Sequence, residues 1–422
     1  MEAIGQLAGE ALAAGGALIE QLHVGIAQRA FTHAPASTPV RALHDGIAKA
    51  VYAGLRDGLR SGAQAGGSLA ARRAREEAGS LSSDPRTAMA LAALNGIYGN
   101  HVAQRARALA FQMEIRRRGR AVVPQATPVR AAFPDATSRI AVFVHGLCET
   151  DDAWRLVAGG RNRSDRRTYG ERLQDELSYT PVYVRYNTGL HVSDNGRELA
   201  RTLEALVQAW PVGVAELVLV GHSMGGLVSR SACHYGERHG MRFADAVRHV
   251  FCLGTPHLGA DLEKGANALS CALGQLPETR ALARFLNARS VGIKDLRYGS
   301  CVEEDWCDCD LDEFLRDRCH EVPFLADAHY YFVCSSLRPA ALGRLVGDLL
   351  VRIPSASGRG SGKGRRIPFE VDNGHELTGL NHFSLLNHPA VYEQLRLWIT
   401  RRPRRAPAAL PAPREPVAML DR

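Results

Sequence analysis

The sequence predicts an α/β fold with a mostly parallel central sheet, helices on both of its faces and an all-helical N-terminal region. The first observation is that strand-like apolar runs alternate with helical patterns between about residues 138 and 400, which is typical of a parallel sheet. The second is an apolar run, 215–220, that passes directly into a glycine-rich turn and then into a helical pattern. The third is the three-to-four spacing of apolar residues over residues 1–120, which predicts helices.

The N-terminal region, residues 1–120, is expected to hold several helices separated by Gly- and Ser-containing breaks. Its first apolar residues, from Ile4 to Ile26, recur at helical spacing and form no continuous apolar run, so they predict an amphipathic helix and not a signal peptide. Long amphipathic helices usually bury their apolar face within their own protein. We therefore favour a layer packed on the next domain over a membrane- or partner-binding module. Further helices are expected over 42–59, 87–94 and 101–116.

Composition predicts a large intracellular protein with reduced cysteines. The chain has 422 residues and 45% hydrophobic content, enough for one large domain with an additional region. Its net charge of +8 comes mostly from arginine and does not by itself indicate a nucleic-acid partner. The nine cysteines are scattered and odd in number, so free thiols are expected. No run of about 20 uncharged apolar residues occurs, and we expect a cytoplasmic protein.

The α/β domain is expected over residues 138–400. A Pro- and Ala-rich stretch, 121–137, is expected to link it to the N-terminal region, and a basic Pro/Ala tail, 401–422, is expected to be disordered. Within the domain, strands are predicted over 139–144, 181–186, 216–220, 249–253 and 330–334, and helices over 196–210 and 389–400.

The turn after the apolar run 215–220 carries Gly-His-Ser-Met-Gly, a G-x-S-x-G pattern centred on Ser223. Gly221 and Gly225 stand where a sharp strand-to-helix turn brings backbone against backbone, so that a Cβ would clash. Such a turn raises the serine hydroxyl above the sheet. Because strand, turn and helix follow in the required order, Ser223 is predicted to be a nucleophile.

A serine hydroxyl needs a histidine to accept its proton, and His382 is the predicted base. In this type of fold the histidine lies in a loop near the C-terminus, and His382 comes just before the last predicted helix. His375, in a turn-like segment, and His388, at the beginning of the last helix, are the alternatives.

The histidine in turn needs a buried carboxylate, and Asp348 is the predicted acid. It follows the late strand 330–334, whereas the alternatives Asp295 and Asp310 fall in the segment before that strand. The oxyanion of an acyl-transfer intermediate requires backbone N–H donors. We assign them to Met224, which follows the nucleophile, and to Leu147, in the loop after His145-Gly146.

A long insertion, 259–328, lies between the strand 249–253 and the acid-bearing region. It is long enough for several helices, and it contains Cys301, Cys307, Cys309, Cys319 and His320. These are ligand types that zinc prefers, but they lack paired C-x-x-C knuckles, so we expect neither a metal nor another cofactor. Cys148 is expected to be a small filler beside the site.

Taken together, the blocks along the chain resemble those of the α/β-hydrolase superfamily. Within it they are similar to the bacterial lipase/esterase branch with GPI inositol-deacylase-like and triacylglycerol lipase-like proteins. The resemblance covers about residues 138–400 and rests on Val144-His145-Gly146-Leu147, Gly221-His222-Ser223-Met224-Gly225-Gly226, Leu253-Gly254-Thr255-Pro256-His257-Leu258-Gly259, the Gly347-Asp348 turn and His382.

The resemblance implies an α/β-hydrolase fold in which residues 259–328 form a helical lid. It also implies a catalytic triad and two oxyanion donors at positions of this chain. One departure from the pattern is Leu349, because many relatives have glycine after the acid. The implied triad is Ser223, Asp348 and His382, and the implied donors are Leu147 and Met224.

The predicted function is therefore hydrolysis of carboxylic esters through an acyl-enzyme on Ser223. A lid rich in Leu and Ala favours an apolar acyl group, as in a lipase or esterase. We expect any membrane contact to be peripheral, through the N-terminal helices or the lid. An acyltransferase or thioesterase would use the same triad, and a non-catalytic membrane- or partner-binding protein is the alternative from another class.

Overall fold

The computed structural model describes residues 85–155, 167–275, 279–336, 348, 350–359 and 365–401. The predictions made for the helix 42–59, for the segment from Ile4 to Ile26 and for the tail beyond Arg401 lie outside these described residues.

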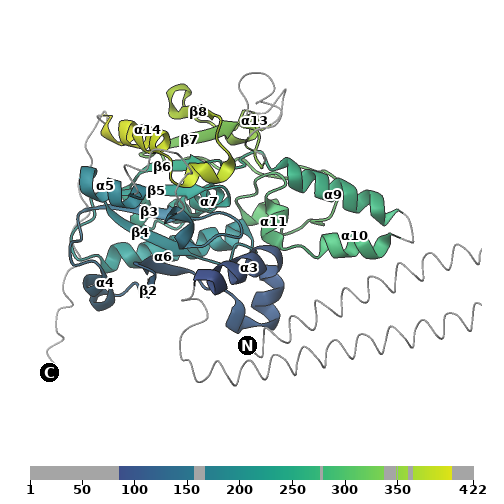
Figure 1. The fold of residues 1–422 in the computed structure, drawn as a ribbon, viewed down its shortest axis with the longest axis horizontal. Coiled ribbons are helices and arrows are strands. Elements are labelled where there is room, and N and C mark those ends of the chain that lie inside the picture. Colours follow the sequence, from purple (N-terminus) through teal and green to yellow (C-terminus); the bar gives the residue numbers. More distant parts are fainter. Residues whose placement is uncertain are drawn as a thin grey trace, which may run out of the picture.

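A mixed sheet organises the described chain, with strands in the order β2-β1-β4-β3-β5-β6-β7-β8 (Figure 1). The neighbouring pairs from β4 through β3, β5, β6 and β7 to β8 are parallel, and β1 is antiparallel to both β2 and β4. The predicted mostly parallel sheet is therefore confirmed. The strands are β1 Glu114–Arg117, β2 Arg120–Val122, β3 Arg139–Val144, β4 Thr180–Arg185, β5 Glu216–His222, β6 Val247–Leu253, β7 His329–Ser336 and β8 Gly374–Thr378.

Alternating side chains of the central strands enter two separate core layers. In β5, Leu217 and Leu219 belong to one apolar cluster, whereas Val218 and Val220 belong to the other. Successive side chains of a strand point to opposite faces, so a strand buried on both faces must be apolar throughout. This explains why the apolar run could be recognised as a strand.

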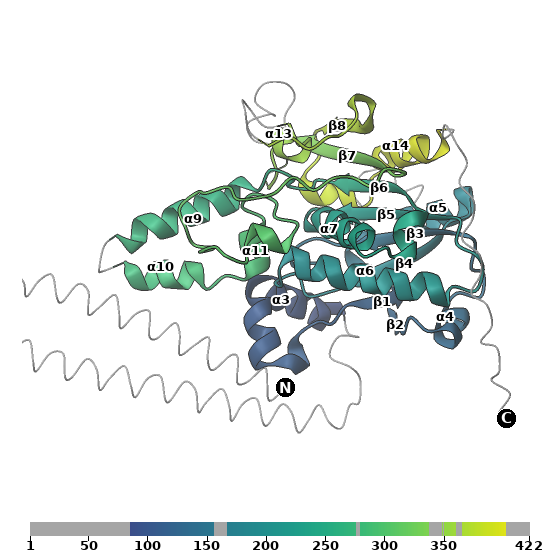
Figure 2. The same ribbon diagram turned by 180° about the vertical axis from the view of Figure 1, so that it is seen from behind.

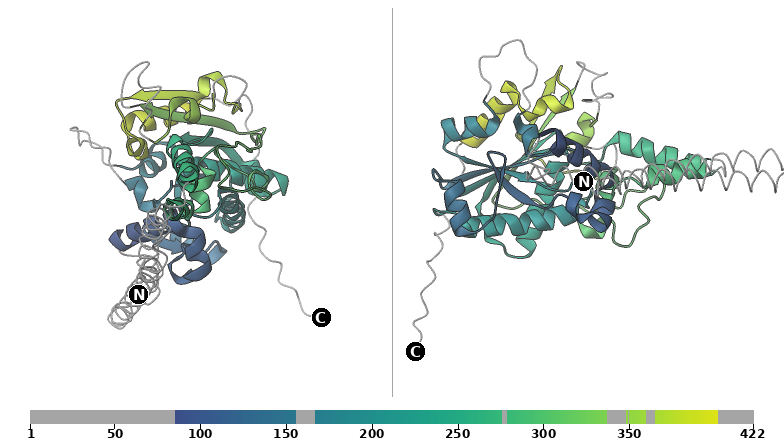
Figure 3. Two further views of the ribbon diagram at one scale, coloured as in Figure 1. Left: turned by 90° about the vertical axis from the view of Figure 1, so that its right-hand side faces the viewer. Right: turned by 60° about the horizontal axis from the view of Figure 1, so that its bottom comes forward.

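Helices cover both faces of the sheet, as predicted (Figures 2 and 3). α5 (Tyr169–Leu177) and α14 (Pro389–Thr400) supply Tyr169, Leu173, Tyr392 and Trp398 to one core layer. The other layer receives side chains from α4 Ala126–Ala132, α6 Val192–Ala209, α7 Met224–Arg238 and α8 Arg242–Ala246.

Two expectations for the region before β3 were wrong. The helix expected over 101–116 ends earlier, because α3 spans Pro85–Arg105 and residues 114–117 form β1. Ile115 of β1 pairs with Val122 of β2 and with Val184 of β4, and it is buried. Ladder hydrogen bonds to β4 thus override the helical spacing of the sequence.

The stretch 121–137, expected as a linker, instead contains the end of β2 and helix α4. Val129 and Phe133 of this segment are buried in the core layer beside α6, and the Phe133 ring lies 5.0 Å from the Trp210 ring between centroids. The segment therefore packs as part of the α/β body.

Helix α3 lies against the body at several points. Ser290 donates from its backbone N–H to Ile97 O at 2.7 Å and from its hydroxyl to Gly96 O at 2.6 Å. The Asn187 side chain, in the loop after β4, donates to Gly99 O at 3.1 Å. The described part of the N-terminal region is thus a layer packed on the body.

The insertion 259–328 contains helices, and two of them form a hairpin that extends away from the sheet (right in Figure 1, left in Figure 2). The hairpin consists of α9 Asp261–Gly274 and α10 Arg280–Asn287, and α11 Val291–Asp295 follows.

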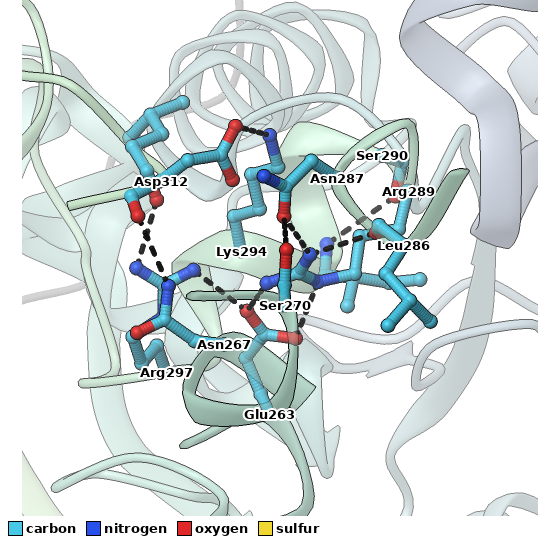
Figure 4. Close-up of polar contacts among 12 residues, drawn as sticks. Glu263, Asn267, Ser270, Leu286, Asn287, Arg289, Ser290, Lys294, Arg297 and Asp312 are labelled. Carbon is cyan, nitrogen blue, oxygen red and sulfur yellow. Dashed lines mark hydrogen bonds and ion pairs between the residues drawn. The ribbon is translucent and has the colours of Figure 1, made fainter. Parts of the chain in front are cut away.

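Helix α9 has its polar face inward. Glu263, Asn267 and Ser270 are buried, whereas Leu262 and Leu269 are 69% and 53% exposed. The buried residues are held by polar partners from α10 and the segments after it (Figure 4). Glu263 pairs with Arg289 at 2.6 Å and Arg297 at 3.0 Å, and Ser270 Oγ lies 2.6 Å from Asn287 Oδ1. Pairing of this kind is what allows charged groups to be buried.

All nine cysteines lie in described residues, and each is free. Among the described residues, no group of three or more His, Cys, Asp or Glu side chains is arranged to hold a metal ion. No helix within the described ranges combines the length and apolar character that crossing a membrane requires.

Candidate active site

The candidate site lies at the carboxyl ends of the parallel strands. Strand register aligns these ends, because Val144 of β3 pairs with Gly221 of β5, and Leu253 of β6 pairs with both His222 of β5 and Val333 of β7. The segments that leave β3, β5, β6 and β7 therefore meet at one edge of the sheet, where ligands bind in open α/β sheets.

Ser223 occupies the strained turn between β5 and α7, which we call the elbow. Its backbone has φ 51° and ψ −121°, a conformation that non-glycine residues rarely adopt. A Cβ at Gly225 would lie 2.1 Å from Val144 O, and a Cβ at Gly221 would lie 2.5 Å from Gly226 N. Both glycines are thus required by close backbone approach, as the sequence predicted.

Gly254, directly after β6, lies close to both Ser223 and His382. The Ser223 N–H donates to Leu253 O at 2.8 Å, and Gly254 follows Leu253 in the chain. A Cβ at Gly254 would lie 3.0 Å from His382 Cε1, and its φ is +61°. Ser223 and His382 therefore both lie at the end of β6, and the absence of a side chain at Gly254 leaves room for the imidazole.

The structure brings His382 and Asp348 together. His382, at the beginning of the 3₁₀ helix His382–Leu386, places Nδ1 2.7 Å from Asp348 Oδ2. Both residues are buried, with exposures of 3% and 1%. The other carboxylate oxygen accepts backbone N–H groups from Leu350 at 3.0 Å and Val351 at 2.8 Å. In the described residues the His382 ring has Asp348 as its only hydrogen-bond partner, which leaves Nε2 available.

The loop after β3 places Leu147 beside the elbow. A Cβ at Gly146 would lie 3.0 Å from Ser223 Cβ, so this loop packs directly on the serine. Tyr186 OH donates to His145 O at 2.7 Å and thereby anchors the start of the loop. No partner for the N–H of Leu147 or Met224 is found in the part of the chain that the structure describes, so both groups can serve as donors.

Cys148 turns away from the elbow toward α3. Its φ is 59°, its N–H donates to Thr188 Oγ1 at 3.2 Å, and a Cβ at Gly96 would lie only 2.2 Å from its Sγ. Burial raises the pKa of the Cys148 thiol to about 11, with a further contribution from the Glu149 carboxylate. The thiol is therefore protonated near neutral pH and fills space, which agrees with the expected filler.

The alternative histidines have other surroundings. His375 lies in β8, where its ring meets the Trp398 ring at 6.5 Å between centroids. His388 caps α14, and its Nδ1 accepts the Ala390 N–H at 3.2 Å. Burial lowers the pKa of both rings.

The alternative acids are also occupied elsewhere. Asp295, in α11, accepts from His191 Nδ1 at 3.1 Å and from the Val192 N–H at 2.8 Å. Asp310 is exposed, and its Oδ1 accepts the Asp312 N–H at 2.9 Å.

Two site residues were missed by the sequence analysis, Glu149 and His222. His222 Nδ1 lies 3.0 Å from Glu149 Oε1, and His222 Nε2 lies 3.2 Å from His382 O. His222 is the variable second residue of the G-x-S-x-G pattern, which carries no signal for a side-chain contact. Glu149 lies 73 positions from its partner. Only its position three residues after Gly146 could have drawn attention to it.

One family model is similar to the central part of the chain. Residues 135–315 match the family model described as PGAP1-like alpha/beta domain. No curated protein is significantly similar to the chain.

Several solved structures resemble the chain. The mature form of the lipase BlEst2 from Bacillus licheniformis is 19% identical, with a TM-score of 0.40 over 62% of this chain and 91% of that one. The propeptide form is 20% identical, with a TM-score of 0.42 over 63% and 51%. EstA from Clostridium botulinum is 14% identical, with a TM-score of 0.34 over 62% and 86%.

The sheet order, the strained serine elbow on β5 and the matched family model agree with one another. The protein therefore has the α/β-hydrolase fold, and its residues 135–315 are similar to the PGAP1-like alpha/beta domain family.

Proposed function

We propose that the protein hydrolyses carboxylic esters through an acyl-enzyme on Ser223, with His382 and Asp348 as the other members of a catalytic triad. One observation carries the proposal. The buried His382–Asp348 pair, 2.7 Å apart, lies at the same sheet edge as the strained Ser223 elbow. A nucleophile, a base and an orienting acid are the parts that acyl transfer requires.

The reaction would proceed in two stages. His382 Nε2 takes the proton of Ser223 Oγ as the hydroxyl attacks the ester carbonyl, and Asp348 holds Nδ1–H and stabilises the imidazolium. The N–H groups of Leu147 and Met224 donate to the oxyanion. His382 then protonates the leaving alcohol, and the acyl group stays on Ser223. In the second stage His382 deprotonates a water, which releases the acid and restores the serine.

An apolar acyl group is the preferred substrate in this proposal. Phe383, adjacent to His382, is 53% exposed, and the two ring centroids are 5.8 Å apart. Leu147, beside the elbow, is partly buried against the core. These side chains would offer apolar contact to an acyl chain bound over Ser223.

The proposal extends to contact with a lipid surface. Apolar esters partition into lipid, and α9 presents Leu262 and Leu269 outward. An exposed apolar helix face is a feature of surfaces that meet a partner or a membrane. We therefore assign peripheral lipid contact to the α9 face.

The test is a panel of p-nitrophenyl esters from acetate to palmitate, assayed with the wild type and with Ser223→Ala. We expect hydrolysis by the wild type, and a loss of roughly 10⁴-fold or more in kcat for the variant, because losing a triad nucleophile leaves only oxyanion and binding effects. A fluorophosphonate probe should label the wild type alone. Equal rates in the two proteins would refute the mechanism, and product analysis with an added alcohol separates hydrolysis from acyl transfer.

A further inference from the structure

Glu149 and His222 form a second buried acid–histidine pair next to His382 of the candidate triad. His222 Nδ1 lies 3.0 Å from Glu149 Oε1 and 3.1 Å from Oε2. The side-chain exposures are 0% for His222 and 9% for Glu149. Neither residue takes part in the proton transfers described above, so their burial beside the site needs another explanation.

The pair contacts all three segments that form the site. Glu149 Oε2 accepts the N–H of Gly146 at 2.7 Å, one residue before the donor Leu147. His222 immediately precedes Ser223, and its Nε2 lies 3.2 Å from the backbone carbonyl of His382. The loop after β3, the elbow and the histidine loop are therefore joined through two side chains.

These contacts limit the protonation states open to the pair. Nε2 of His222 faces a carbonyl oxygen, which only accepts, so this nitrogen must carry a proton. Nδ1 faces a carboxylate, which also accepts when ionised. Both bonds are made by an imidazolium beside a carboxylate, or by a neutral ring that accepts at Nδ1 from a protonated Glu149, and the electrostatic surroundings favour the imidazolium.

We propose that Glu149 and His222 are positioning residues. They hold the loop after β3, which carries the Leu147 donor, and the His382 backbone at fixed positions relative to Ser223. Glu149 holds Gly146, and with it the Leu147 donor, while His222 holds the carbonyl of His382. This inference rests on the proposed function of Ser223, His382 and Asp348. A displacement of about 1 Å in such a group costs about 10²-fold in rate, so the pair would act on kcat without touching substrate.

The electrostatic surroundings agree with a charged pair. Burial alone would lower the pKa of His222, but attraction and hydrogen bonding to Glu149 raise it above its ordinary value. Burial opposes the ionised form of Glu149, yet His222 and the Gly146 N–H hold the pKa of this carboxyl below its ordinary value. The other titratable groups around the pair are His382 and Asp348 on the histidine side and His145, Cys148 and Tyr186 on the loop side.

The experiment compares Glu149→Ala and Glu149→Gln with the wild type on p-nitrophenyl butyrate. Glu149→Ala removes the acceptor for both Gly146 and His222, and we expect kcat to fall about 10²-fold with KM changed less than about threefold. In Glu149→Gln the side chain can still accept from Gly146 and can donate to a neutral His222 Nδ1, while Nε2–H still reaches His382 O. We therefore expect this variant to keep kcat within about fivefold.

The pH profile distinguishes positioning from mere stability. In the wild type, kcat should decline on the alkaline side as His222 loses a proton and gives up one of its two bonds. Glu149→Gln, in which His222 is already neutral, should lack this decline. Asp295→Asn is the matched control, because Asp295, at the end of α11, is a buried partner of His191. It should lower the unfolding temperature without changing kcat or the pH profile.

The outcomes separate the two proposals. An inactive wild type, or one equalled by Ser223→Ala, refutes the proposed function. An active wild type and an inactive Ser223→Ala, with Glu149→Ala keeping kcat within twofold, overturn the positioning inference. Should Glu149→Ala not fold, ¹⁵N-histidine NMR of the wild type near pH 7 decides. We expect both ring nitrogens of His222 to be protonated, and a neutral ring would overturn the inference.

Discussion

The strained backbone of Ser223 bears directly on the proposed chemistry. A positive φ at a residue with a Cβ costs free energy of order 1–3 kcal/mol, and it persists only where the surroundings enforce it. Here Gly221 and Gly225 allow the close backbone approach, and the Leu253 carbonyl holds the Ser223 N–H at 2.8 Å. The turn thus exposes one hydroxyl in a defined direction.

The proposed acid of the triad, Asp348, can be tested by a single isosteric change. Asp348→Asn would present an amide to His382 Nδ1 and favour the wrong ring tautomer, so we expect kcat for p-nitrophenyl butyrate to fall by about 10⁴-fold with little change in stability. His375→Ala is the matched control and should keep near wild-type activity, since His375 lies in β8 beside Trp398. A normal rate for Asp348→Asn would remove Asp348 from the triad.

The Glu149–His222 pair should also shape the pH dependence of stability. The lowered pKa of Glu149 contributes stability that is present above pH 4.5 and is lost as pH falls through the folded value. The raised pKa of His222 contributes stability that is present below pH 6.5 and is lost as pH rises through the folded value.

We therefore expect the difference in unfolding free energy between the wild type and Glu149→Gln to be largest from about pH 4.5 to 6.5 and smaller on both sides. Urea denaturation across this range measures it. A difference that does not vary with pH would contradict an ionised pair.

At the scale of elements, α9 shows that a helical pattern does not reveal which face is buried. Leu262 and Leu269 are exposed. Glu263, on the opposite face, is buried and paired with Arg289 and Arg297 (Figure 4). Burying the carboxylate without these partners would be costly, so the polar face must be satisfied by the neighbouring segments.

The outward face of α9 carries the prediction of lipid contact. Leu262→Ser combined with Leu269→Ser should weaken binding to phosphatidylcholine vesicles about tenfold, because two leucines would lose their apolar burial. Hydrolysis of soluble p-nitrophenyl acetate should be unaffected. Leu397→Ser on α14, where Leu397 is 52% exposed, is the matched control and should bind as the wild type does. Equal vesicle binding by all three proteins would exclude this surface.

At the scale of the whole molecule, α3 ties the site to the insertion. It touches Cys148 of the loop after β3, Asn187 after β4 and Ser290 at the beginning of α11. A change in the packing of α3 should therefore alter both stability and activity.

Gly99→Ala tests this coupling. The new Cβ would lie 2.0 Å from Asn187 Oδ1 and 2.8 Å from Gly189 Cα, so we expect a loss of about 1–3 kcal/mol in stability and a lower kcat. Gly265→Ala in α9 is the matched control. The added Cβ would have no atom within 4 Å, so this variant should be neutral or slightly stabilising. Thermal unfolding and ester hydrolysis measure both effects, and an unchanged Gly99→Ala protein would show that α3 packs loosely.

Local sequence determined the central strands, the elbow and the order of the site residues along the chain. Buried strands and backbone contacts between glycines depend on nearest neighbours, so apolar runs and G-x-S-x-G are sufficient to locate them. The helix predicted over 101–116 was wrong because β1 is held in its extended conformation by pairing with β4. The linker predicted over 121–137 was wrong because α4 is buried against α6. Short elements with weak local preference follow their tertiary partners.

Only the tertiary structure decided which polar groups meet. Asp348 and not Asp295 lies beside His382, across 34 positions, and Glu149 reaches His222 across 73. His222 in turn reaches the His382 carbonyl across 160. Sequence spacing alone does not give such distances, because they are set by where the strands end in the sheet. Ser223 was therefore predictable from its own turn and Asp348 from the order of the elements, whereas the contact of Glu149 with His222 was decided by the fold.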